Sequence, residues 1–158
     1  VETDLRRGSI ARVLGLAQHP DLVDLLDGNA ELHEAMRRDP KTGAYVLCAQ
    51  PGVADPAGLL LSERMQDLIK TLEKHFDLIV FDTTPLLSVT DALPVLRYSD
   101  DVVMAVRWRR SSAETMRSCL TILREAGVSL TCAVMTMTRG REFRKYEDYY
   151  YTTESTSP

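Results

Sequence analysis

Four short segments of the chain consist almost entirely of apolar residues, many of them branched. Each is four to eight residues long and is flanked by polar or turn-forming residues, which is typical of strands buried on both faces of a parallel sheet. The segments cover residues 44–49, 78–81, 101–106 and 129–136. We therefore predict four buried strands.

Between these segments, apolar residues recur at steps of three and four, the spacing that places side chains on one face of a helix. The first series comprises Leu59, Leu60, Met65, Leu68, Ile69 and Leu72, and the second comprises Met116, Leu120, Leu123 and Ala126. Ser111 or Ser112 is a candidate N-cap for the second helix, and Gly127 is placed to end it. The alternation predicts an α/β domain with a doubly wound, mainly parallel sheet flanked by helices.

This pattern stops after Thr138, so we assign residues 1–138 to the domain and residues 139–158 to a tail. The tail begins with a basic stretch that comprises Arg139, Arg141, Arg144 and Lys145. A polar segment with four tyrosines follows: Tyr146, Tyr149, Tyr150 and Tyr151. This segment has no apolar period that would bury it, and its composition predicts a flexible tail.

The overall composition narrows the class of protein. Of the 158 residues, 44% are hydrophobic and 27% are charged, as in soluble globular domains. The net charge of −4 predicts no general attraction to nucleic acid, and no apolar run approaches the roughly 18 residues that span a bilayer. Cys48, Cys119 and Cys132 are far apart in sequence, which favours reduced thiols in a cytoplasmic protein over a disulfide or a metal site.

Acidic residues at the carboxyl ends of the strands are the first candidates for a functional site, because ligands of open α/β sheets bind at that edge. The apolar segment at residues 78–81 runs directly into Asp82, and Pro85 follows in a turn. A carboxylate in this position suits Mg²⁺, a hard cation that prefers oxygen ligands. The alternative is that Asp82 only caps the following turn.

A second acidic pair stands at the start of the sequence. Glu2 and Asp4 are two residues apart, so at the end of a strand both side chains would point to the same side. Arg6 and Arg7 follow directly, and acids beside arginines could hold a metal-bound phosphate or accept a substrate proton. A frayed, charged terminus is the alternative interpretation.

Other motifs carry less information. The sequence contains no GxxxxGK[ST] loop that would hold nucleotide phosphates and no Cys/His cluster with metal-site spacing. The histidines are interpreted as surface or helix residues. Residues 107–110, RWRR, could form a basic lip beside a nucleotide with Trp108 stacked on a flat ring, but a solvated loop is the simpler interpretation.

Taken in order, these segments resemble the cytoplasmic kinase domain of the bacterial tyrosine kinases (BY-kinases) that accompany capsule and exopolysaccharide export. Residues 1–16, VETDLRRGSIARVLGL, resemble the second acidic motif of the family, the Walker A′ strand. Residues 76–92, FDLIVFDTTPLLSVTDA, resemble its Walker B segment, whose pattern is close to fD.viiDtPP…tDa. A C-terminal tyrosine cluster completes the set. The resemblance covers nearly the whole chain and implies a P-loop NTPase-like fold.

The resemblance also implies roles for individual residues. Asp82 would be the Walker B acid that helps to hold Mg²⁺, and Asp4 would share the metal. Glu2 and Asp4 would be the Walker A′ acids, one at the metal shell and one placed to accept the tyrosine proton. Arg6 and Thr136 would contact ATP, and the tail tyrosines would be the phosphate acceptors.

Several positions depart from the family pattern. Glu2 stands where Asp is usual, Thr84 where a proline is usual, and Thr136 where relatives commonly carry an Asn that contacts adenine. The Walker A loop of the family would precede Val1. We therefore expect the chain to be the C-terminal part of a longer kinase domain, and we expect that by itself it does not transfer phosphate from ATP.

As a whole, the resemblance implies an autophosphorylating protein-tyrosine kinase that regulates polysaccharide polymerisation and export. It also implies a homo-oligomeric ring with phosphorylation in trans, at the cytoplasmic side of the bacterial inner membrane. The implied partners are a membrane chain-length regulator, the export machinery and a tyrosine phosphatase. Two alternatives are a degenerate, non-catalytic module that docks on the export machinery, and a partition-type ATPase switch.

Overall fold

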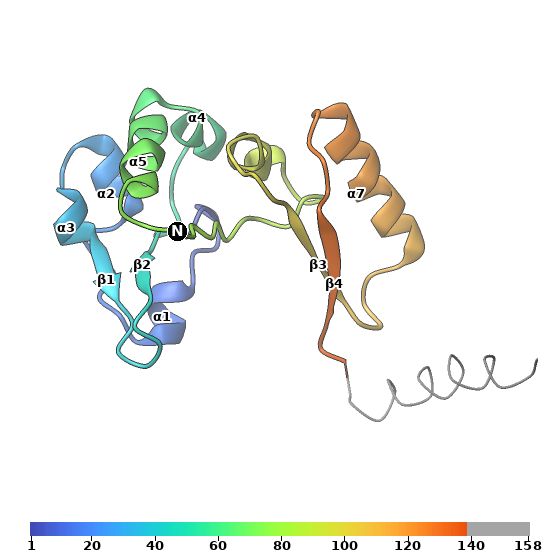
Figure 1. The fold of residues 1–158 in the computed structure, drawn as a ribbon, viewed down its shortest axis with the longest axis horizontal. Helices are drawn as coiled ribbons and strands as arrows, with labels where there is room; N and C mark the ends of the chain where they lie inside the picture. The colour runs from blue at the N-terminus through green and yellow to red at the C-terminus, as the bar shows by residue number, and fades with distance from the viewer. Residues whose placement is uncertain (139–158) are drawn as a thin grey trace, which may run out of the picture. The chain divides into compact units, whose positions relative to one another are not determined.

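The computed structural model of the chain describes residues 1–138, which fall into two compact units, Val1–Ser99 and a second unit that begins at Asp100 (Figure 1). The predicted acceptors Tyr146, Tyr149, Tyr150 and Tyr151 lie outside the described residues. None of the helices within residues 1–138 combines the length and the apolar character needed to cross a bilayer.

The first unit contains most of the elements. In chain order they are α1 (Ile10–Leu14), α2 (Leu22–Asp27), α3 (Leu32–Ala35), β1 (Met36–Arg38), β2 (Tyr45–Leu47), α4 (Pro56–Leu60), α5 (Glu63–Glu73), the 3-10 helix η1 (Thr90–Ala92) and α6 (Leu93–Leu96). The second unit contains β3 (Val103–Arg107), α7 (Ala113–Glu125) and β4 (Cys132–Thr136). Strand β1 pairs with β2 in the antiparallel orientation, and β3 pairs with β4 in the parallel orientation.

The first residues of the chain lie between β2 and the segment that ends at Asp82. The Glu2 amide donates a hydrogen bond to the carbonyl of Leu47 at the end of β2 (2.9 Å). On the other side, the Thr3 amide donates to the Asp82 carbonyl (2.7 Å) and the Asp82 amide donates to the Val1 carbonyl (2.9 Å). Glu2 and Asp82 therefore form a parallel bridge, which joins the two acidic segments of the sequence.

Residues 78–81 are more exposed than expected and do not form the predicted strand; the single bridge of this segment lies just after them, at Asp82. Ile79 and Phe81 pack against the core, whereas Leu78 and Val80 are 78% and 65% exposed. The prediction of burial on both faces is therefore wrong for this segment. It alternates like a half-buried strand, because apolar partners within the described unit cover only one of its faces.

The first periodic series of apolar residues forms two helices, α4 and α5, separated by a break at Leu61. Asp55 caps α4 by accepting a hydrogen bond from the Gly58 amide (3.0 Å), and Ser62 caps α5 by accepting one from the Met65 amide (3.2 Å). The apolar face of α5 is buried in the core of the unit, as the periodicity predicts. The residues on this face are Met65, Leu68, Ile69 and Leu72.

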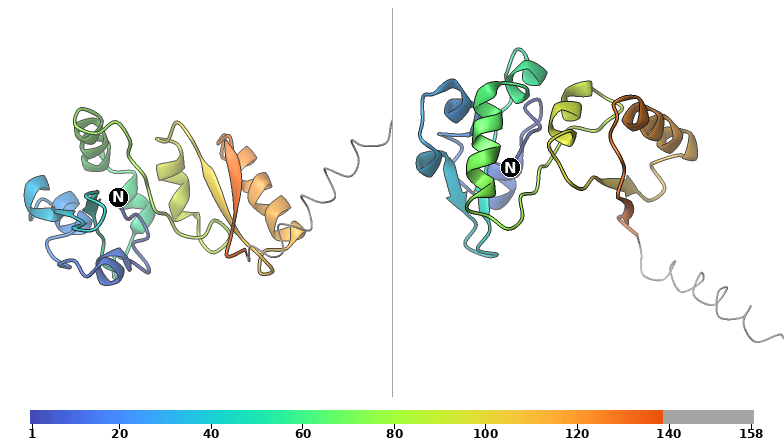
Figure 2. Two further views of the ribbon diagram at one scale, coloured as in Figure 1. Left: turned by 60° about the horizontal axis from the view of Figure 1, so that its bottom comes forward. Right: turned by 45° about the horizontal axis from the view of Figure 1, so that its top comes forward.

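The second periodic series forms α7, which lies beside the β3–β4 pair (Figure 2). Ser112 is its N-cap and accepts a hydrogen bond from the Thr115 amide (3.1 Å), and Gly127 follows the helix with a φ of 71°. The predicted limits of this helix are confirmed. Burial of both strand faces is again not observed, since Val103 is 59% exposed and Val134 is 48% exposed. In the described part of this unit, one helix accompanies the strand pair.

Candidate functional site

Glu2 is the most deeply buried acid of the predicted site, with 1% of its surface exposed. Its Oε1 atom accepts hydrogen bonds from the amides of Ser9 and Ile10, where α1 begins. Its Oε2 atom accepts one from the amide of Ala49, just after β2 (2.9 Å). Three backbone donors compensate the buried charge, so the carboxylate ties the N-terminal segment to two other parts of the unit.

Asp4 is half-buried and bonds differently. Its Oδ1 atom accepts hydrogen bonds from the amides of Arg6 (3.1 Å) and Arg7 (2.9 Å), a turn in which the Asp side chain caps its own backbone. Its Oδ2 atom has no hydrogen-bond partner among the described residues. The Glu2 carboxylate, by contrast, accepts its hydrogen bonds in the interior of the unit.

Asp82 is held through its backbone and leaves its side chain exposed. The Thr3 hydroxyl donates to the Asp82 carbonyl (2.8 Å), in addition to the Thr3 amide. In the described part of the chain, no hydrogen bond or ion pair reaches the Asp82 carboxylate. Reduced hydration around the carboxyl group, and then the negative charges of Glu2 and Asp4, raise the pKa of Asp82. A cation at this position would relieve the repulsion, so Asp82 is chemically suited to hold a metal.

The parallel bridge brings Glu2, Asp4 and Asp82 into one region of the first unit, as the sequence predicts for acids at strand ends. Their carboxylates do not converge fully. The ligand atoms of Glu2, Asp4 and Asp82 are not all within 4.8 Å of one another, a spacing that, among residues 1–138, is found in another group of residues. A cation held by Asp4 and Asp82 would therefore need water or phosphate oxygens as well, which is usual for Mg²⁺.

Arg6 forms a two-pronged ion pair with Asp91. Its Nε donates to Oδ2 of Asp91, and its second terminal nitrogen donates to Oδ1 (3.3 Å). The Arg6 side chain is 49% exposed, whereas Asp91, in η1, is buried. Arg6 was predicted to contact ATP. In the structure its guanidinium already has a carboxylate partner, Asp91. Asp91 belongs to the TDA sequence at the end of the segment that resembles Walker B, and the sequence pattern predicted no role for it.

Two threonines that depart from the family pattern lie in different units. Thr84 is buried in the first unit, and its hydroxyl has no hydrogen-bond partner within the described residues. Thr136 ends β4 in the second unit, and its hydroxyl donates to the Val106 carbonyl of β3 (3.4 Å). The Thr136 oxygen can still accept a hydrogen bond, as adenine contact would require.

Comparison with known proteins finds relatives that are named as enzymes. No family model matches it. The chain is 28% identical over 130 residues to the tyrosine-protein kinase Ptk of Acinetobacter johnsonii, an alignment that covers 82% of this chain and 18% of that protein. It is 28% identical over 135 residues to the tyrosine-protein kinase Etk of Escherichia coli K12, which covers 85% of this chain and 19% of Etk. The chain is a homologue of bacterial tyrosine kinases. It spans about a fifth of the length of these relatives.

Solved kinase domains share the fold of this bacterial tyrosine kinase homologue. The kinase domain of VpsO superimposes with a TM-score of 0.82 at 25% identity, over 87% of this chain and 68% of that one. The kinase domain of Escherichia coli ETK superimposes with a TM-score of 0.79 at 27% identity, over 87% of this chain and 56% of that one. The P-loop NTPase-like α/β fold expected from the sequence is thereby confirmed.

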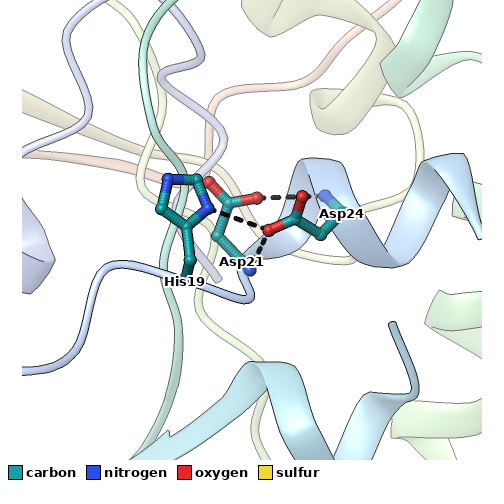
Figure 3. Close-up of side chains that lie close together, drawn as sticks. All are labelled: His19, Asp21 and Asp24. Atoms are coloured by element: carbon teal, nitrogen blue, oxygen red, sulfur yellow. Dashed lines mark hydrogen bonds and ion pairs between the residues drawn. The ribbon is translucent and has the colours of Figure 1, made fainter. Parts of the chain in front are cut away.

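A second cluster of titratable residues in the kinase homologue lies at the start of α2 (Figure 3). Asp21 is the N-cap: its Oδ1 accepts from the amides of Val23 (2.8 Å) and Asp24 (3.0 Å), and its Oδ2 accepts from the Gln50 amide (2.8 Å). Asp24 accepts from the Asp21 amide (3.0 Å) and pairs with Nδ1 of His19 (2.9 Å). Although the three side chains could together approach a metal, helix capping accounts for these contacts, and we assign the cluster a structural role.

Proposed function

We propose that the chain belongs to a protein-tyrosine kinase that uses ATP and Mg²⁺ to phosphorylate its own C-terminal tyrosines. The observation that carries this proposal is the Asp82 carboxylate, which has no partner among residues 1–138 and which the parallel bridge holds beside the segment of Asp4, in a homologue of bacterial tyrosine kinases. The proposed acceptors are Tyr146, Tyr149, Tyr150 and Tyr151.

Asp4 and Asp82 would hold Mg²⁺, because each offers a carboxylate oxygen without another partner in the described part of the chain. The bound ion would neutralise charge on the transferred phosphoryl group. In the transfer, the tyrosine oxygen forms a bond to the γ-phosphorus, the bond to ADP breaks, and the phenol proton passes to a carboxylate. Asp4 is the candidate for that carboxylate, and Glu2, whose oxygens accept from three backbone amides, would support it by holding the segment that carries Asp4.

Arg6 and Thr136 are the proposed contacts to ATP. The half-exposed Arg6 guanidinium has N–H groups beyond those bonded to Asp91, and the Thr136 hydroxyl oxygen can accept a hydrogen bond. The printed sequence contains no glycine-rich loop for the β- and γ-phosphates. We therefore expect the 158-residue chain, incubated alone with ATP, to transfer no phosphate.

The biological setting follows from the same homology. We propose that the kinase acts at the cytoplasmic side of the bacterial inner membrane, as a homo-oligomer whose copies phosphorylate one another. Its proposed partners are a membrane chain-length regulator, the machinery that exports capsule or exopolysaccharide, and a tyrosine phosphatase. Each phosphate would add about −1.5 to −2 charges beside Glu147 and Asp148, and the resulting repulsion would loosen an assembly.

The test uses the full-length protein that contains this chain, with Mg²⁺ and ATP labelled at the γ-phosphate. We expect label in the C-terminal peptide, and we expect Asp82→Asn to reduce it roughly 100-fold, the scale on which loss of one charge-stabilising group slows a reaction. Asp77→Asn is the matched control, because Asp77 is an exposed acid in the same segment and lies outside the proposed metal site. Equal labelling in the Asp82→Asn protein would contradict the proposal. Labelling only by a second, added kinase would favour the docking module instead.

A further inference from the structure

Asp4 is bracketed by two attachments to the same distant segment, residues 82–91. On one side, the amide and the hydroxyl of Thr3 both donate to the Asp82 carbonyl (2.7 and 2.8 Å). On the other side, the guanidinium of Arg6 is paired with Asp91 through two nitrogens. Asp4 lies between these attachments. Its Oδ2 has no hydrogen-bond partner among the described residues and could bind a cation.

The second attachment has a rigid base. Asp91 is 5% exposed and lies in η1, which continues directly into α6. Val95 of α6 is fully buried and belongs to the hydrophobic core of the unit. In the described part of the chain, the Asp91 carboxylate has no hydrogen-bond partner other than Arg6. The Asp91 carboxylate is thus held in place by the core, and among the described residues it bonds to Arg6 alone.

We propose that Asp91 is a positioning residue, which acts through Arg6 to set the placement of the Asp4 carboxylate relative to Asp82. The inference rests on the proposed function, since it assigns Asp4 and Asp82 to the metal. Arg6 links the two acids: its side chain is bonded to Asp91, and its backbone amide donates to Oδ1 of Asp4. The planar fork of Arg fixes direction as well as distance, because it makes two contacts to one carboxylate.

Without Asp91, the turn from Asp4 to Arg7 would keep the Thr3 attachment and the buried side chain of Leu5, but the Arg6 side chain would lose its anchor. The amides of Arg6 and Arg7, which donate to Oδ1 of Asp4, would then be held less firmly. The Asp4 carboxylate would then sample a range of placements, and a metal or phosphoryl group needs ligands held within a fraction of an ångström. Arg6 therefore has a role at the proposed metal site that does not depend on contact with phosphate: it holds Asp4 in place.

The experiment follows single amides of the ¹⁵N-labelled chain by NMR. In Asp91→Asn we expect the amides of Arg6 and Arg7 to exchange with water about tenfold faster, while core amides of α5 are unchanged. Arg6→Gln removes the same ion pair from its exposed partner and should give the same result. Asp91→Glu keeps the charge and should restore slow exchange. Asp67→Asn is the matched control, since it breaks the exposed ion pair between Asp67 and Lys70.

A second measurement adds Mn²⁺ as a paramagnetic probe of the metal site. We expect the unchanged chain to show line broadening at Asp4 and at Asp82, and Asp91→Asn to need about tenfold more Mn²⁺ for the same broadening, because one of the two metal ligands is then poorly placed. Unchanged exchange at Arg6 and Arg7 in Asp91→Asn would overturn the positioning role, and so would exchange that rises uniformly through the unit, as simple destabilisation would give. If Mn²⁺ broadens neither residue in the unchanged chain, the proposed metal site fails, and the exchange data still decide whether Asp91 positions Asp4.

Discussion

Two buried threonines beside the proposed metal-binding acids differ in their hydrogen bonding. Thr3, next to Asp4, is 2% exposed and donates its hydroxyl to the Asp82 carbonyl (2.8 Å). Thr84, two residues after Asp82, is 5% exposed and its hydroxyl has no partner among the described residues. A buried hydroxyl without a partner costs stability, whereas a satisfied one contributes to it, so the same substitution should act in opposite directions at the two positions.

Thr84→Val is expected to raise the free energy of unfolding by about 1 kcal/mol, because it removes an unsatisfied polar atom at nearly constant shape. Thr3→Val, the matched control, should lower it by about 1 kcal/mol, because it removes a hydrogen bond and leaves one acceptor with fewer donors. Urea denaturation followed by circular dichroism measures both. Destabilisation by Thr84→Val would show that its hydroxyl has a partner in solution.

At the scale of elements, the start of α2 should respond to pH through His19 and Asp24. The hydrogen bond from His19 lowers the pKa of Asp24, and the same contact raises the pKa of His19. The raised pKa of His19 adds stability that is complete below its ordinary value of 6.5 and is lost as pH rises through the folded-state pKa. The lowered pKa of Asp24 adds stability that is complete above 3.8 and is lost as pH falls through the folded-state pKa.

The pair should therefore stabilise α2 most between about pH 4 and pH 6.5, where both groups are charged. We expect the difference in Tm between the unchanged chain and His19→Gln to be larger at about pH 5.5 than at about pH 8. His33→Gln is the control, because His33 forms no ion pair in the described part of the chain. A Tm difference that stays constant over this range would mean that the contact with Asp24 is not an ion pair.

Elements were predictable where their signals are local. Helix α7 follows from apolar periodicity and from the cap Ser112, and α5 follows from periodicity alone; these signals lie within a few residues of one another. Helix α2 carried an equally local signal that was overlooked, a capping box formed by Asp21 and Asp24. By contrast, the exposure of residues 78–81 depends on which distant segments pack against them. A short apolar segment of sequence does not indicate whether one face or both faces will be covered.

At the scale of the whole molecule, the core of the first unit draws on nearly all of its elements. Leu60, at the end of α4, is fully buried in this core, whereas the adjacent Leu61 is 49% exposed. Leu60→Ala is expected to lower the free energy of unfolding by about 3 kcal/mol, through lost burial and the cavity left behind. Leu61→Ala, the matched control, should change it by no more than about 0.5 kcal/mol. Guanidinium denaturation measures both, and similar losses for the two variants would contradict the packing described for α4.

The candidate site was predictable only in part, for the same reason of distance. Asp82 and Asp4 stand out in the sequence because acids at strand ends share one edge of a sheet, and the parallel bridge bears this out. The interior contacts of Glu2 with Ser9, Ile10 and Ala49 were not predictable, since the pattern of residues 1–4 is the same for an inward and an outward carboxylate. The partner of Arg6 is 85 positions away and carries no local signal.

These separations also bear on when the site can form during synthesis. The hydrogen bonds of Thr3 can form only once Asp82, 79 positions later, has been synthesised. The ion pair of Arg6 requires Asp91, 85 positions later. During synthesis, Asp4 therefore cannot take its place relative to Asp82 while the helices α1 to α5 emerge. The two attachments that bracket Asp4 close only after the last of these helices has emerged, so the placement of Asp4 beside Asp82 is among the final events in the folding of the first unit.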